Sequence, residues 1–185
     1  MRLGVESVDR LLEGNERVEF YGEWDVVLYL AHRAVAASAP VNVVVVQDFG
    51  VFDPFLVKRL QRALRNPGEV YVRRAFKAED VKATIESFEG EVIVIDPYHH
   101  RKNYTEITSA LRRTVWAFTR EAKGLPQGGA FNHHSMHVIV RVSRGKWGYR
   151  FRFVKHPLLS DVEVPLSVQE MLNGGIQEKG LLSFM

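Results

Sequence analysis

The stretch VEFYGEWDVVLYLAH, residues Val18–His32, decides the fold of this 185-residue chain. A strand is expected over Val18–Tyr21, and apolar residues at helical spacing follow soon after Gly22. Nucleotide-binding enzymes place a glycine-rich phosphate loop and its lysine at such a junction. Here Glu-Trp-Asp follows the glycine directly, and Glu23 and Asp25 would put negative charge where phosphates should lie. Ordinary binding of ATP through a phosphate loop is therefore not expected.

Length and composition indicate one globular domain. The chain is 46% hydrophobic and 25% charged, which is typical of a folded rather than a disordered protein. No apolar run approaches the roughly 20 residues of a membrane helix, and MRLGVESVDRLLEG lacks the apolar core of a signal peptide. We therefore expect a cytoplasmic protein without membrane association. Cysteine is absent, which excludes disulfides and thiolate metal sites and is typical of thermophilic proteins.

Strands and helices alternate along the first half of the chain. Continuous β-branched runs predict four strands buried on both faces: Val18–Tyr21, Val41–Val46, Val70–Val72 and Val92–Ile95. Helical spacing predicts three helices between them: Asp25–Ser38, Pro54–Arg65 and Ala78–Phe88. Asp53 is a good N-cap before Pro54. The alternation predicts an α/β fold with a mainly parallel central sheet and helices on both faces.

The second half of the chain changes character. A longer helix is expected over Tyr104–Ala122, because four of its apolar residues would form one stripe: Ile107, Leu111, Val115 and Phe118. After the glycine-rich KGLPQGG, the stretch MHVIVRVSRGKWGYRFRFVKH predicts an antiparallel hairpin at one sheet edge, with its turn at Gly145–Gly148. We expect a core domain over 1–168 and a tail over 169–185.

Basic residues gather in two groups, within a chain of net charge +3. The hairpin holds six without an intervening acid: Arg141, Arg144, Lys146, Arg150, Arg152 and Lys155. If Phe151 and Phe153 point inward, the neighbouring arginines point outward, where they could grip a phosphate backbone while Trp147 stacks on a base. The second group has only Glu69 as a counter-charge: Lys58, Arg59, Arg62, Arg65, Arg73, Arg74 and Lys77. A solvated face with ion-pair networks is an equally good interpretation of these patterns.

The order of several motifs resembles the core domain of the RecA/RadA recombinase superfamily, particularly its RadB-like and KaiC-like members. LGVESVDRLLEG, VVVVQDFGVFDPFLVKRL, VYVRRAFKAEDVKATIE, VIVIDPY and the terminal hairpin are each similar to a family segment. They are collinear from Leu3 to about Val168. The resemblance implies a RecA-like fold, with Asp96 at the Walker B position and Phe49 in place of the catalytic glutamate.

The departures from the family fall on its nucleotide site, which would be degenerate at Gly22, Glu23, Asp25, Phe49 and Asp96. Hydrolysis by the family mechanism then loses its chemical basis. The resemblance implies a pseudo-ATPase without a cofactor, an accessory protein in DNA recombination, repair or replication. Protein partners are expected. Nucleic acid is a second candidate ligand, and the sequence leaves homo-oligomer formation open.

Two alternatives remain open. Asp48, Asp96, His99 and His100 would lie near the carboxyl ends of strands, where such sheets bind ligands. Carboxylates and imidazoles could hold a divalent metal, so the alternative function is a metal-dependent hydrolase or nuclease, although the histidines follow no established ligand spacing. The other alternative is a purely structural module that pairs with a partner through its sheet edge or tail.

The C-terminal residues contain a short motif. Leu181, Phe184 and Met185 have a spacing similar to that of a peptide that binds the sliding clamp, although Glu178 replaces the usual glutamine. Short motifs of this kind match by chance often. A closing turn of the fold is the alternative interpretation of this tail.

Overall fold

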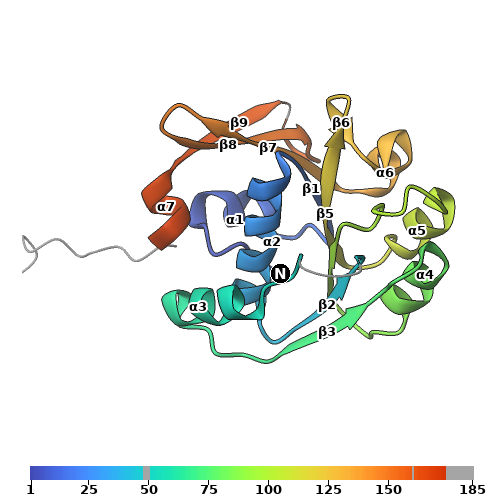
Figure 1. The fold of residues 1–185 in the computed structure, drawn as a ribbon. Helices are drawn as coiled ribbons and strands as arrows, with labels where there is room; N and C mark the ends of the chain where they lie inside the picture. The colour runs from blue at the N-terminus through green and yellow to red at the C-terminus, as the bar shows by residue number, and fades with distance from the viewer. Residues whose placement is uncertain (48–50, 160, 174–185) are drawn as a thin grey trace, which may run out of the picture.

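The computed structural model describes residues 1–47, 51–159 and 161–173 (Figure 1). From the N-terminus onward, the helices and strands of these residues are the following: α1 (Glu6–Leu12), β1 (Arg17–Gly22), α2 (Trp24–Ser38), β2 (Val41–Val45), α3 (Pro54–Leu64), β3 (Val70–Arg74), α4 (Ala78–Glu86), β4 (Val92–Ile95), α5 (Tyr104–Ala110), β5 (Val115–Ala122), β6 (Leu125–Pro126), α6 (Gly129–Ser135), β7 (Val138–Gly145), β8 (Gly148–Lys155), β9 (Val162–Ser167) and α7 (Val168–Asn173).

One large sheet organises the molecule. Its strand order is β3-β2-β4-β5-β1-β7-β8-β9, and the short β6 pairs with β5. The strands from β3 to β7 pair in parallel, whereas β8 and β9 are antiparallel additions. This confirms the predicted α/β fold with a mainly parallel sheet and a C-terminal antiparallel hairpin. No helix in the described part of the chain is both long and apolar enough to cross a membrane.

Helices cover both faces of this sheet (Figure 1). On one face α1, α2, α3 and α7 enclose a core that includes Leu30, Leu60 and Met171. On the other face α4 and α5 pack a second core through residues such as Val81 and Ile107. Asp53 caps α3 as expected, because its carboxylate accepts hydrogen bonds from the backbone N–H groups of the first helical turn.

The predicted helix over Tyr104–Ala122 is wrong. Helix α5 ends at Ala110, and Val115 begins strand β5, which lies between β4 and β1. A strand in this position is covered on both faces, so Val115–Phe118 are buried side chains in succession. The helical spacing of the apolar residues was a coincidence of two adjacent elements.

Two expectations about the sheet edges also need correction. Strand β3 was predicted to be buried on both faces, but Tyr71 and Val72 are 52% and 39% exposed because β3 is the outermost strand on its side. At the other edge the predicted hairpin forms with its turn at Gly145–Gly148. It is not the edge itself, because β9 pairs with β8 and lies outside it.

Candidate functional site

The junction of β1 and α2 lies where the family that the sequence resembles binds phosphates. One residue, Glu23, separates the end of β1 at Gly22 from the start of α2 at Trp24. The backbone of β7 passes very close to this junction. A Cβ atom on Gly22 would lie 1.9 Å from the carbonyl oxygen of Val142, and Gly22 has a φ of +145°. The glycine is therefore required by the close approach of β7.

Two acids and one arginine occupy the solvent side of this junction. The Glu23 carboxylate accepts a hydrogen bond of 3.0 Å from the backbone N–H of Arg144. The guanidinium of Arg144 pairs with Asp25 and lies 3.9 Å from a second oxygen of Glu23. These side chains are about half exposed or more. The two acids that the sequence analysis identified at this junction, Glu23 and Asp25, therefore pair with Arg144 of β7.

A second polar cluster lies at the end of β4. Asp96, which is 1% exposed, follows this strand in the left-handed region with a φ of 57°. Its Oδ2 atom accepts hydrogen bonds from Gln47 at 2.7 Å and Arg120 at 2.9 Å, and His99 Nδ1 lies 3.3 Å away. The guanidinium of Arg120 also stacks over the ring of Trp24, 4.1 Å from its centroid. Arg120 therefore neutralises the Walker B-like carboxylate directly.

The metal alternative gains no support from this cluster. In residues 1–47, 51–159 and 161–173, no three His, Asp or Glu side chains gather in a way that could hold a metal ion. His99 and His100 do adjoin Asp96 in the chain, and their rings lie edge to face at 5.1 Å. However, Arg120 forms an ion pair with Oδ2 of Asp96, which is the same carboxylate oxygen that lies near His99. Asp48 lies outside the described residues, so the metal site stays an untested prediction.

A buried glutamate was missed by the sequence analysis. Glu19 lies in the middle of β1 and is completely buried. Its Oε1 atom accepts hydrogen bonds from Thr119 at 2.8 Å and from Asn132 at 2.9 Å, while Oε2 has no partner among the described residues. Asn132 in turn accepts a hydrogen bond from the Tyr98 hydroxyl. Burial raises the pKa of the Glu19 carboxyl to about 7.

This network ties α6 to the centre of the sheet, because Asn132 belongs to that helix. Burial also raises the pKa of the Tyr98 hydroxyl, so the phenol remains a neutral hydrogen-bond donor. The signal in the sequence was a single glutamate in the apolar run VEFYG. The prediction that Val18–Tyr21 is buried on both faces already implied burial of Glu19, but its contacts with Thr119 and Asn132 depend on which elements lie beside β1.

The hairpin confirms the predicted alternation of side chains. Phe151 and Phe153 are completely buried, whereas Arg150 and Arg152 face the opposite side and are about half exposed. Most of its cations are already paired with acids from other segments: Arg141 with Glu121, Arg144 with Glu23 and Asp25, Arg150 with Glu163, and Arg152 with Asp161. Lys155 donates to the backbone carbonyl groups of His133 and Met136.

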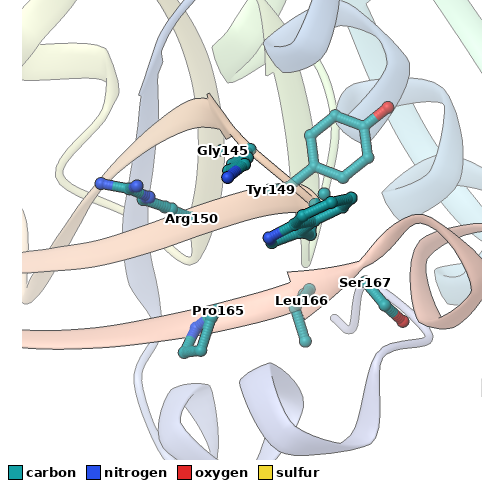
Figure 2. A pocket seen from close by; sticks show the side chains of 9 residues that line it. Gly145, Tyr149, Arg150, Pro165, Leu166 and Ser167 are labelled. Atoms are coloured by element: carbon teal, nitrogen blue, oxygen red, sulfur yellow. The ribbon is translucent and has the colours of Figure 1, made fainter.

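The turn of the hairpin keeps one aromatic side chain in solvent. Trp147 is 80% exposed, and Lys146 Nζ lies 5.1 Å from the centroid of its ring. Beside it is a shallow hollow of about 270 Å³ between the hairpin turn and β9, and Figure 2 shows Tyr149 and Leu166 among its lining side chains. The nucleic-acid role of this hairpin stays a prediction, with Lys146 and Trp147 as its least engaged members.

Several predicted residues lie outside the described part of the chain. They are Asp48 and Phe49 after β2, and the tail residues Leu181, Phe184 and Met185. The first residues of the expected tail belong to α7, where Met171 is buried and its carbonyl accepts a hydrogen bond from Arg33. The clamp-binding motif remains a prediction from the sequence.

The fold has clear relatives among solved structures. A KaiC-like protein from the archaeon Pyrococcus horikoshii aligns with a TM-score of 0.61 at 11% identity, over 94% of this chain and 96% of its own. The flagellar accessory protein FlaH of Methanocaldococcus jannaschii aligns with a TM-score of 0.57 at 12% identity, over 86% of this chain and 89% of its own. No protein-family model and no curated protein matches the sequence.

These neighbours define the class of fold. The parallel sheet, the covering helices and the antiparallel C-terminal strands match these proteins, which have a RecA-like fold. The chain therefore has a RecA-like fold, as the motif order suggested. At identities of 11 and 12%, the comparison establishes the fold and leaves function to the residues.

Proposed function

We propose that this chain is a non-catalytic, RecA-like accessory protein that neither binds nor hydrolyses ATP. The observation that carries the proposal is the junction of β1 and α2, where only Glu23 separates strand from helix. A phosphate loop needs several successive residues whose backbone N–H groups converge on the anion. One residue cannot supply them, so this junction does not fit the phosphates of ATP.

The charges at the junction support the same proposal. Glu23 and Asp25 would repel a triphosphate, and Arg144 is held by both acids instead of being free to bind an anion. The catalytic side of the site is equally unsuited. Asp96, which would help to hold Mg²⁺ in an ATPase of this class, is bonded to Arg120 and Gln47. The residues present therefore offer no route for phosphoryl transfer by the family mechanism.

We further propose a process for this protein. The motif order of the recombinase superfamily runs through most of the chain, and the RecA-like fold agrees with it. We place the protein in the cytoplasm, in DNA recombination, repair or replication, where it acts by binding to components of that machinery. A RecA-like core without a nucleotide site is most useful there as a rigid scaffold for protein contacts.

The test is a comparison of phosphate release from Mg²⁺-ATP by the wild-type protein and by the variant Asp96→Ala. We expect no difference between the two, with and without single-stranded DNA, because Asp96 has no catalytic task in this account. An ATPase of the same fold with an intact phosphate loop serves as the positive control. Turnover that the wild type shows and Asp96→Ala loses would contradict the proposal.

A further inference from the structure

The second basic group forms a face around α3. Lys58, Arg59, Arg62 and Arg65 are all positioned on this helix and its C-terminal cap, with their side chains reaching toward solvent. Among the described residues, none of these four side chains forms an ion pair with an acid, since every pair found in 1–47, 51–159 and 161–173 lies elsewhere. One acid, Glu69, lies near them: it lines the adjoining groove with Lys58, accepts a hydrogen bond from the Tyr71 hydroxyl and forms no ion pair with these four side chains.

Grooves run along this basic face. Lys58, Arg62 and Arg65 line a groove of about 600 Å³ together with Gln61 and Pro67. A neighbouring groove of about 510 Å³ lies between α3 and β3. The two grooves share Lys58, Gln61 and Pro67, so they form one continuous depression. We call this depression, with the exposed side of α3 and β3, the α3–β3 face.

Aromatic side chains accompany the cations on this face. Tyr71 lines the groove beside β3 and is 52% exposed. Phe55 is 77% exposed in the first turn of α3, four and seven residues before Arg59 and Arg62, and so on the same side of the helix. Phe55 and Tyr71 therefore present ring surface to solvent near these cations.

The two basic groups differ in the electric field that they produce. In the hairpin, carboxylates lie within 4 Å of Arg141, Arg150 and Arg152, so the opposite charges cancel at longer range. Salt screens what remains over about 8–10 Å. On the α3–β3 face Glu69 is the one acid among the residues that line the two grooves, so positive charge exceeds negative charge there and attracts a polyanion from a distance. The two groups lie at opposite edges of the sheet, because β3 and β9 are its terminal strands (Figure 1).

We infer that the α3–β3 face binds single-stranded nucleic acid. Arg59, Arg62 and Lys58 contact successive phosphates, and the exposed aromatic rings stack on bases, which only a single strand presents freely. An acidic peptide would satisfy the cations, but it offers no flat rings to Phe55 and Tyr71. This inference goes beyond the proposed function and does not depend on it, because ATP plays no part in the contact.

The test measures fluorescence anisotropy of a labelled oligothymidylate of about 20 nucleotides, longer than the ~4–16 nucleotides that one small domain covers. Variant Arg59→Gln with Arg62→Gln removes two unpaired cations from the α3–β3 face. Variant Arg150→Gln with Arg152→Gln removes two paired cations from the hairpin and is the matched control. Thermal unfolding confirms that each variant is folded, and Lys146→Gln replaces the hairpin control if that variant does not fold.

We expect the α3 variant to weaken binding about tenfold at low salt and to lower the slope of log K against log salt by about 1.4, since each single-strand phosphate contact contributes about 0.7. The hairpin control should change neither quantity appreciably. Tyr71→Ala should weaken binding about fivefold or more if its ring stacks on a base.

Four results would overturn the inference. They are absence of binding at low salt, a loss of affinity in the hairpin control that matches or exceeds the loss in the α3 variant, tighter binding of a duplex of the same length, and displacement by polyglutamate as effective as displacement by unlabelled oligothymidylate. The last result would identify the face as a docking site for acidic protein segments. None of these results bears on whether ATP binds.

Discussion

Gly22 illustrates how one residue is fixed by its neighbours in space. It has a left-handed φ of +145°, and a side chain would collide with the carbonyl of Val142. We predict that Gly22→Ala lowers the free energy of unfolding by about 2–4 kcal/mol. Gly14→Ala is the matched control, because Gly14 also has a positive φ, of +75°, but open space around it. Gly14→Ala should lower the free energy of unfolding by only about 1 kcal/mol.

Urea unfolding of both variants separates the effect of the positive φ from the effect of the collision with the carbonyl of Val142. Equal losses would mean that backbone strain alone accounts for Gly22 and that β7 can move away from the junction. In that case the junction would be less rigid than the close approach of β7 implies.

Glu19 should make stability depend on pH. Its pKa is raised from 4.5 in the unfolded chain to about 7, so between these values the folded protein holds a proton that the unfolded chain releases. Stability therefore falls as pH rises from about 4.5 to 7, by on the order of 3 kcal/mol, and then stays low. In Glu19→Gln this contribution disappears, because the amide keeps the acceptor for Thr119 and Asn132 and cannot ionise.

The measurement is urea unfolding of the wild type and Glu19→Gln at pH 5 and pH 8. The difference between the two proteins isolates Glu19 from all other titrating groups. We expect the free energy of unfolding of Glu19→Gln, relative to that of the wild type, to be larger at pH 8 than at pH 5. Glu13→Gln, at an exposed position, should show no such change. A difference that is the same at both pH values would contradict the burial of an ionisable Glu19.

At the scale of elements, the position of a strand in the sheet should set its resistance to opening. Strand β5 pairs on both sides and is buried on both faces, whereas β3 pairs only with β2. We predict that the amides of Trp116–Phe118 exchange with solvent only on global unfolding, and that alternate amides of β3 exchange much faster. Hydrogen exchange resolved by residue tests this. Equal protection of β3 and β5 would contradict the strand order.

The same two strands show how far the sequence could predict the fold. Strands β1, β2 and β4 were found because their β-branched runs are bounded by clear breaks, and helices α2, α3 and α4 were found by their spacing. Strand β5 was mistaken for the end of a helix. Its pairing partners are β4 and β1, and Val18 alone is almost a hundred positions before its partner Trp116. Local periodicity contains no information about such pairing.

Prediction of the candidate site from the sequence was limited in the same way, because contacts between distant segments could not be predicted. Local sequence predicted the short junction and the alternation in the hairpin, since both depend on adjacent residues. It could not predict that Asp161 and Glu163 pair with the hairpin arginines, or that Arg120 forms an ion pair with Asp96. These contacts depend on which strands are neighbours. The charge of a segment in sequence is therefore a poor guide to its charge in space.

Over the whole molecule, three surfaces differ in how their charges are balanced. At the β1–α2 junction, Glu23 and Asp25 form ion pairs with Arg144. Most cations of the hairpin are balanced by acids. The α3–β3 face differs from both, because within the described ranges its helix cations have no acidic partner.

We propose that this RecA-like core has no site for ATP, and calorimetric titration of the full chain with Mg²⁺-ATP tests this proposal. Because the β1–α2 junction has one residue and two acids in place of a phosphate loop, we predict no saturable heat up to about 1 mM nucleotide, which corresponds to binding weaker than about −4 kcal/mol. Saturable binding with a Kd in the micromolar range would contradict the account.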